Sequence, residues 1–279
     1  MNFKQGLDNN ELYQTNDIFI SNYVIQAKYE NALPRVFSRD NVALDGALQI
    51  AVTVADAVEN IRCGGIGTKR QDFLYGSFRS YMRMSSIRGT VAAMYIYNPD
   101  SEIDIEVLSA IEPPQSYFAI HPGIIENGRA SALTHDNHWL GFDPTSGFHE
   151  YRFDWFPNLV VFYIDGVEAR RLNTNIPSSA GRFMFNHWTD GNANFSGGPP
   201  TETAKLEIMN ITAWFNLSAS SSPKCQESNK SCNIKDVIAQ LVAKDGPSSA
   251  ISNRPPASIR HIVLIFIIFL IEYIINSFQ

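Results

Sequence analysis

Acidic and aliphatic residues alternate between residues 101 and 108, where Glu102, Asp104 and Glu106 are separated by Ile103 and Ile105. A period of two belongs to a β-strand, so the three carboxylates are expected on one face and the aliphatic side chains on the other. Like charges on one strand face repel each other, a cost that a solvated face keeps small. The alternative is an acid pair for glycoside hydrolysis, with the middle carboxylate shifting the pKa values of the other two. Because no Lys or Arg lies nearby in the sequence to neutralise these charges, we favour the acid pair.

The composition limits the classes of protein that fit. The chain has 279 residues, of which 44% are hydrophobic, which is enough for one large all-β domain or two small ones. The formal net charge of −6 gives no indication of a nucleic-acid partner, and we expect none. Neither a P-loop, a nucleophile elbow nor a zinc-ligand spacing occurs, and we expect no cofactor. Two histidines and an aspartate within residues 135–138 are interpreted as a polar loop, not as a metal site.

Strand-like segments recur along most of the chain. The candidates are residues 18–24, 48–54, 73–84, 90–98, 149–155, 159–164, 167–172, 182–188 and 204–214. The Gly-rich residues 60–71 and most of residues 112–147 are expected to be loops. A turn at residues 98–101 should join the strand before it to the acidic strand in an antiparallel hairpin, with Tyr95 and Tyr97 bordering the carboxylates. This pattern predicts an all-β, two-sheet antiparallel sandwich over residues 1–218.

The C-terminal part follows a different pattern. Residues 219–258 are expected to hold a pair of cysteines, Cys225 and Cys232, a short helix at 233–245 and a linker. Residues 259–279 contain an unbroken apolar run at 262–271, which follows small residues and a polar spacer. This order is typical of a GPI-anchor signal, and a simple membrane tail anchor is the alternative.

N-glycosylation sequons in the chain indicate where in the cell the protein is found. Asn-x-Ser/Thr occurs at Asn194, Asn210, Asn216 and Asn229, which favours a secreted glycoprotein. The first 22 residues lack the apolar region of a signal peptide. We expect an extracellular protein of the cell surface or cell wall, held to the membrane by the C-terminal tail or a GPI anchor, and we expect a monomer.

Three ordered blocks of sequence resemble glycoside hydrolase family 16. The first, residues 75–108, contains Tyr-Gly-x-Phe, Gly-Thr-x-Ala-Ala and then Glu-Ile-Asp-Ile-Glu. The second consists of residues 148–155 together with 163–166. The third combines Asn-His-Trp at 186–188 with Ser-Gly-Gly-Pro-Pro at 196–200, and it resembles fungal, GPI-anchored members in particular.

The resemblance implies a concanavalin A-like jelly roll with a β-glucan cleft on its concave face. It implies a retaining mechanism in which Glu102 is the nucleophile and Glu106 is the general acid and then the base. Asp104 would hydrogen-bond toward the nucleophile. Residues four apart on a flat strand are about 13 Å apart at Cα, whereas retention requires carboxyl groups about 5–5.5 Å apart, so the strand is expected to curve.

The resemblance also implies walls for the cleft. Tyr95, Tyr97 and Trp188 match aromatic positions that contact sugar in relatives, and Asn186 matches an amide that hydrogen-bonds a sugar hydroxyl. Core packing is the alternative for each ring.

Four further residues are interpreted by position. Trp155 is expected in the core, and His149 is expected to have a structural role. Arg79 and Tyr81 stand where bacterial glucanases place a Glu and an Arg on the donor side of the cleft, so the preferred linkage cannot be transferred from those enzymes.

The expected function is retaining hydrolysis of β-glucan, either endo-β-1,3- or mixed-linkage, in cell-wall polysaccharide metabolism. A cell-wall transglycosylase on the same fold is an alternative, because the covalent intermediate is the same and only the acceptor differs. A non-catalytic glucan-binding wall protein or a lectin-like sandwich is another, although neither would need all three carboxylates.

Overall fold

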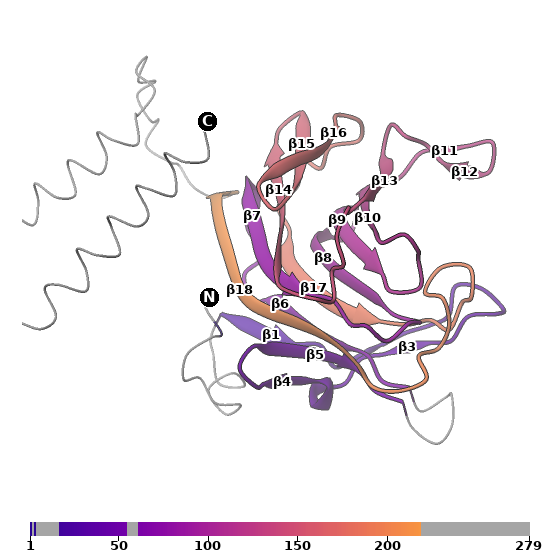
Figure 1. Cartoon of the computed structure of the whole chain (residues 1–279). Helices are drawn as coiled ribbons and strands as arrows, with labels where there is room; N and C mark the ends of the chain where they lie inside the picture. The colour runs from indigo at the N-terminus through magenta and orange to yellow at the C-terminus, as the bar shows by residue number, and fades with distance from the viewer. Residues whose placement is uncertain (2, 4–16, 55–60, 219–279) are drawn as a thin grey trace, which may run out of the picture. The chain divides into compact units, whose positions relative to one another are not determined.

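The computed structural model describes residues 1, 3, 17–54 and 61–218, which form two antiparallel sheets of seven strands each, with two small two-stranded sheets (Figure 1). The all-β sandwich prediction is therefore confirmed. The predicted helix at 233–245, the cysteine pair and the apolar run at 262–271 lie outside the described residues. Among the described residues, no helix has the length and apolar character needed to cross a membrane.

Sheet I contains the acidic strand near its middle. Its strands in spatial order are β1 (Ile18–Ile20), β6 (Gly64–Thr68), β17 (Arg182–Trp188), β8 (Val91–Asn98), β9 (Ser101–Leu108), β10 (Gln115–His121) and β13 (His135–Trp139).

Sheet II packs against it. Its strands in spatial order are β16 (Val167–Leu172), β15 (Leu159–Ile164), β14 (His149–Phe156), β7 (Phe73–Arg83), β18 (Ala204–Leu217), β5 (Leu48–Val52) and β4 (Val42–Leu44). The smaller elements are the pair β2 (Val24–Ile25) and β3 (Arg35–Val36), the pair β11 (Ile125–Glu126) and β12 (Arg129–Ala130), and the 3-10 helix η1 (Arg39–Asn41).

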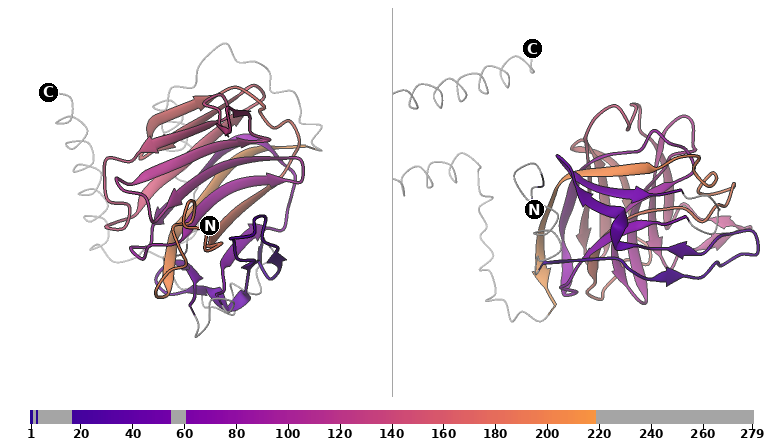
Figure 2. Two further views of the ribbon diagram at one scale, coloured as in Figure 1. Left: turned by 90° about the vertical axis from the view of Figure 1, so that its right-hand side faces the viewer. Right: turned by 90° about the horizontal axis from the view of Figure 1, so that it is seen from below.

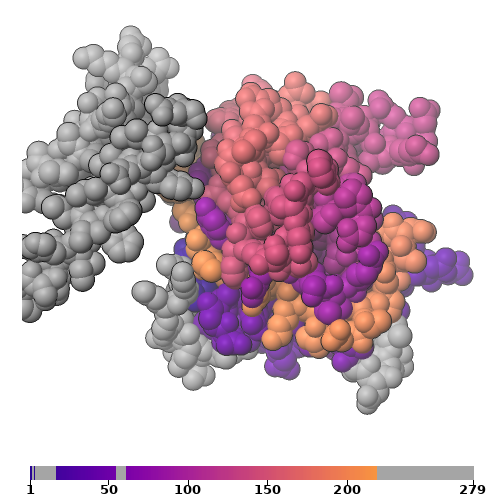
Figure 3. Space-filling model, in the orientation of Figure 1, coloured from indigo at the N-terminus to yellow at the C-terminus, as the bar shows by residue number. Residues whose placement is uncertain are grey.

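Alternate residues of the two facing sheets fill the core. Ile103 and Ile105 of β9 are buried there, and Phe118 of sheet I stacks on Phe162 of sheet II with ring centroids 4.5 Å apart. Strands of the two layers bend along their length (Figure 2). In the space-filling view, side chains close most of the gaps that separate the ribbons of Figure 1 (Figure 3). Because the aliphatic residues of β9 are fixed in this core, its acidic residues must face outward.

Two residues interpreted as structural are confirmed in that role. Trp155 is fully buried, and its Nε1 donates to the carbonyl oxygen of Pro177 at 3.0 Å. The ring of His149 stacks on Phe142 with centroids 3.8 Å apart, and its Nδ1 lies 2.7 Å from Oδ2 of Asp165. Both side chains therefore have structural partners.

The prediction of a loop over residues 60–71 is wrong, because β6 occupies part of this range. A Cβ atom at Gly65 would lie 2.3 Å from Oδ1 of Asn186, and one at Gly67 would lie 2.2 Å from Sδ of Met184. A side chain at either position would force Asn186 or Met184 of β17 to shift, which favours glycine here. Residues that are typical of loops thus serve close packing between strands.

The expected loop over residues 112–147 is also wrong in part, because it contains β10 and β13. In β10 the side chains of Ser116, Phe118 and Ile120 are fully buried and alternate with more exposed neighbours. Prolines flank β10 on both sides, and their presence predicts a loop more strongly than this short period of two predicts a strand. Residues 135–138 lie in β13, so they belong to an edge strand and not to a polar loop.

Candidate active site

The β8–β9 hairpin holds the three carboxylates on one face of sheet I. In its register Glu102 lies opposite Tyr97, and Asp104 lies opposite Tyr95. Glu106 follows on the same face, since the aliphatic residues between the acids are buried in the core. The predicted hairpin and the predicted acidic face are therefore both present.

A cleft of about 810 Å³ lies over this face. Strands β8, β9 and β17 supply one part of its lining, including all three carboxylates. The N-terminal segment that contains β2 and β3 supplies another part, including Tyr23, Lys28 and Arg35. The cleft thus brings two cationic side chains from the start of the chain to the acidic strand.

The outer two carboxylates are set for different protonation states. Burial raises the pKa of Glu106 to about 7, and the charge of Glu102 adds to this rise while Arg35 opposes it. Burial also raises the pKa of Glu102, and here Lys28 and Arg35 act in the opposite direction. Glu106 can hold a proton near neutral pH, as a general acid must, while the cations favour the ionised Glu102 that a nucleophile requires.

Asp104 is the most buried of the three acids. Its pKa is raised well above the ordinary value by burial and then by the charges of Glu102 and Glu106. Among the described residues, its Oδ2 has no hydrogen-bond partner. A protonated Asp104 can donate a hydrogen bond toward a neighbouring carboxylate, and this stabilises the ionised form of that neighbour.

His121 is a site residue that the sequence analysis missed, since it lies in the range expected to be a loop. β10 places it opposite Glu102, and its Nε2 is 3.6 Å from Oδ2 of Asp104. One potential ligand atom from each of Glu102, Asp104 and His121 lies within 4.8 Å of the others. A cation held there would occupy the two carboxylates assigned to catalysis, and the expectation of a metal-free site stays a prediction.

The tyrosines and the amide expected to contact sugar lie in the cleft. Tyr97 is 41% exposed, which leaves ring surface open to a ligand. Nδ2 of Asn186 donates to the hydroxyl of Tyr95 at 2.7 Å, so the amide and the phenol form one polar unit. Oδ1 of Asn186 has no hydrogen-bond partner within the described part of the chain.

Trp188 also lines the cleft, but its ring is only 7% exposed. The guanidinium of Arg35 lies 4.6 Å from the ring centroid, and Phe195 stacks on the ring at 5.8 Å. Trp188 belongs to a buried cluster with Phe37 and Val91. The sequence pattern did not separate a cleft wall from a core residue here, and the ring has little surface left for a sugar.

The expectation that positions 79 and 81 touch the donor side of the cleft is wrong. Arg79 and Tyr81 lie on β7 of sheet II, and neither lines the cleft. Arg79 instead lies 3.4 Å from the carboxylate of Glu150 on the neighbouring strand β14. Consecutive strands of the chain alternate between the two sheets at this point, which sequence similarity alone did not reveal.

Comparison with known proteins agrees with this geometry. Residues 30–209 match the family model described as "Glycosyl hydrolases family 16". The chain belongs to glycoside hydrolase family 16. A likeness to fungal GPI-anchored members in particular is not shown by these comparisons.

The sequence matches to individual relatives extend over about half of the chain. It is 30% identical over 154 residues to a "Beta-glucanase" of Paenibacillus polymyxa, a match that covers 53% of this chain and 61% of that protein. It is 29% identical over 165 residues to a "Xylanase/beta-glucanase" of Ruminococcus flavefaciens, covering 54% of this chain and 20% of that protein. The chain thus spans less than two thirds of the length of each of these two relatives.

Solved structures of the same fold are similar throughout the sandwich. The β-glucanase of Bacillus licheniformis superposes with a TM-score of 0.61 at 22% identity, covering 73% of this chain and 94% of that one. The laminarinase catalytic domain of Thermotoga maritima gives a TM-score of 0.60 at 16% identity, covering 78% and 96%. At these identities the likeness shows the fold.

Arg35 should set the pH range of this family 16 site. Because Arg35 lowers the pKa of both Glu102 and Glu106, Arg35→Met should raise both values. With Glu102 acting in its ionised form and Glu106 in its protonated form, as the family resemblance implies, both limbs of the pH profile of kcat/KM should move to higher pH. The matched control is Arg182→Met, which removes another arginine of the cleft lining and should leave both limbs in place. An unshifted profile for Arg35→Met would contradict this role.

Substitution of Trp188 should mainly lower stability, whereas substitution of Tyr97 should mainly weaken substrate binding. Trp188→Ala empties a buried site, and a loss of about 3–5 kcal/mol should lower Tm by on the order of 10 °C. Tyr97→Ala removes a side chain that is 41% exposed, so it should lower Tm much less than Trp188→Ala does while it raises KM for polymeric substrate. Thermal melts and initial rates on both variants test this. The reverse outcome, with Tyr97→Ala the less stable variant, would place Tyr97 in the core.

Proposed function

We propose that this chain is a retaining β-glucanase that cleaves endo-β-1,3- or mixed-linkage β-glucan. The observation that carries the proposal is the row of Glu102, Asp104 and Glu106 on one face of β9, inside a cleft large enough for several sugar units. Membership of family 16 and the β-glucanase names of the relatives support it. The structural neighbours include a mixed-linkage lichenase from a mouse hindgut metagenome and a laminarinase, which bracket the two linkage classes.

The proposed reaction is a double displacement. Glu102 attacks the anomeric carbon and forms a glycosyl-enzyme ester, while Glu106 gives its proton to the departing glycosidic oxygen. Esterification removes the charge of Glu102, one of the causes of the raised pKa of Glu106. That pKa should then fall, and Glu106 becomes the base that takes a proton from water in the second step. Asp104 donates its hydrogen bond toward Glu102 in the first step.

The alternative of transglycosylation shares every step except the last acceptor. A sugar hydroxyl instead of water would attack the glycosyl-enzyme, and Glu106 would take its proton. The mass of the products separates the two. Incubation with laminarin, lichenan and chitin oligomers should give shorter β-glucan products and leave chitin unchanged. Longer products would favour transfer, and no change on any substrate would favour a binding protein.

The roles of the acids have a direct test. Glu102→Gln and Glu106→Gln should each lower kcat by at least about a thousandfold without changing Tm, because each removes a group that the reaction needs. Asp104→Asn should cost less. Azide should partly restore turnover to Glu102→Ala, since an external anion can fill the space of the missing nucleophile. Near-normal rates in Glu102→Gln would exclude it as the nucleophile.

We also propose a location at the cell surface, with a role in cell-wall polysaccharide metabolism. The support is the order of small residues, polar spacer and apolar run after residue 246 in the sequence. Attachment of a GPI anchor would fall near Ser248, Ser249 or Ala250.

An enzyme treatment tests this anchor. When the chain is secreted in a fungal host behind an added signal peptide, a phosphatidylinositol-specific phospholipase should release it from membranes. Retention on the membrane, with residues 262–269 still present by peptide mapping, would show a tail anchor instead.

A further inference from the structure

The outer face of sheet II carries an exposed tryptophan that the proposed catalysis does not use. Trp214 of β18 is 58% exposed, while its neighbours Ala213 and Phe215 pack against the core. Its side chain therefore points away from sheet I and from the cleft. An indole ring this exposed leaves a large apolar area in water, which is unfavourable unless something covers it.

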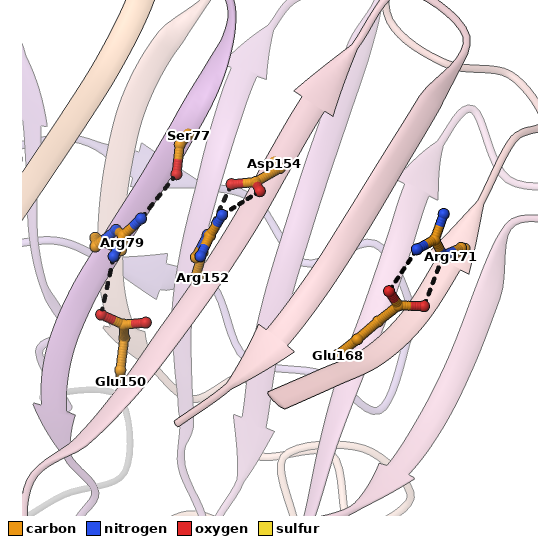
Figure 4. A network of polar contacts seen from close by, with 7 residues as sticks. All are labelled: Ser77, Arg79, Glu150, Arg152, Asp154, Glu168 and Arg171. Atoms are coloured by element: carbon orange, nitrogen blue, oxygen red, sulfur yellow. Dashed lines mark hydrogen bonds and ion pairs between the residues drawn. The ribbon is translucent and has the colours of Figure 1, made fainter. Parts of the chain in front are cut away.

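A cation holds the ring from one side. The guanidinium carbon of Arg79 lies 4.8 Å from the centroid of the Trp214 ring. Arg79 is itself fixed by the carboxylate of Glu150 at 3.4 Å and by the hydroxyl of Ser77 at 3.3 Å (Figure 4). The cation covers one face of the ring and sets its orientation, and the high exposure of the residue leaves the other face open to solvent.

A sequon begins two residues further along the same strand, at Asn216-Leu217-Ser218. Burial alternates through this stretch, with Trp214, Asn216 and Ser218 exposed and the residues between them partly buried. Alternate residues of a strand share one face, and positions two apart are separated by about 6.7 Å at Cα. The Trp214 ring and the acceptor amide of Asn216 therefore lie next to each other on the outer face, and Ser218 follows directly after the strand ends at Leu217.

We propose that Asn216 is an N-glycosylation site, and that the first N-acetylglucosamine of its glycan stacks on the open face of Trp214. Nδ2 of Asn216 would form a bond to the anomeric carbon of a polyprenyl-pyrophosphate oligosaccharide. The bond from that carbon to the pyrophosphate oxygen breaks, the lipid pyrophosphate leaves, and the amide gives up one proton. The proposal requires passage through the secretory route, but it does not depend on the proposed glucanase activity.

The apolar face of a pyranose matches an aromatic ring, and stacking removes both surfaces from water. A sugar linked at Asn216 is already beside the ring, so it loses less freedom on stacking than a free sugar would. Because Trp214 lies on the face opposite the cleft, the glycan would leave the cleft open to polymer.

Two other sequons of the described residues provide internal comparisons. Asn194 is exposed but has Asn192 two residues before it, and Asn210 is half-buried with Ile208 in that position. Neither has an aromatic ring at the position that Trp214 holds for Asn216. Asn194 is therefore an exposed acceptor with no aromatic ring two residues before it, although Ser196 of its sequon is buried.

The first test is occupancy. The full chain, directed into the secretory pathway of yeast by an added signal peptide, is treated with an endoglycosidase that leaves one N-acetylglucosamine. Peptide mass mapping should find this sugar on Asn216 in most molecules. Trp214→Ala should lower the fraction of occupied Asn216 and leave that of Asn194 unchanged. An unmodified Asn216 beside a modified Asn194 would overturn the proposal.

The second test is stability, measured as Tm on the same material. Asn216→Gln should lower Tm by about 2–4 °C when Trp214 is present and by no measurable amount in the Trp214→Ala background. Asn194→Gln should have no effect in either background. Because Trp214 and Asn216 are both exposed, the variants should fold. An equal loss in both backgrounds would show that the glycan does not act through the ring.

Discussion

The site depends on three like charges that β9 cannot move apart. Ile103 and Ile105 lock the strand into the core, and a slip of one residue would exchange the buried and the outward faces. Glu102, Asp104 and Glu106 must therefore share one partly buried face. Burial of this face raises the pKa of all three carboxyl groups, and the neighbouring negative charges add to the rise for Asp104 and Glu106. Packing of the aliphatic face thus produces the acid chemistry of the opposite face.

The counter-charges come from a part of the chain far from β9 in sequence. Lys28 and Arg35 line the same cleft, and the segment between β2 and β3 is tied to the loop after β17 by the hydrogen bond from the amide of Leu33 to the carbonyl of Asp190 at 2.6 Å. Charges held by such contacts act on the carboxylates without having to reorganise during the reaction. The charge environment of Glu102 and Glu106 is therefore a property of two separate elements, and neither element could establish it alone.

The sequence predicted the sandwich, the β8–β9 hairpin and the acidic face, because each follows from a strong period of two. It missed β6, because glycines show no alternation of side chains. The reason for glycine in this strand is visible only in the structure, where Asn186 and Met184 lie against it. It missed His121 and Arg35, since their roles come from contacts across strands and between distant segments. It placed Arg79 in the cleft because the resemblance matches positions in sequence only. Which sheet a strand joins depends on the path of the chain in space, and β7 belongs to sheet II.

Trp188 shows how core packing and electrostatics meet in this cleft. Its ring is buried, yet it supports the guanidinium of Arg35 at 4.6 Å. An arginine held by a carboxylate has its charge largely cancelled by that partner. Within the described residues, Arg35 is held by an aromatic ring instead, and such a ring attracts the cation without neutralising it. The positive charge therefore stays available to Glu102 and Glu106, and the packing of an indole in the core contributes, through Arg35, to the field in which these two acids titrate.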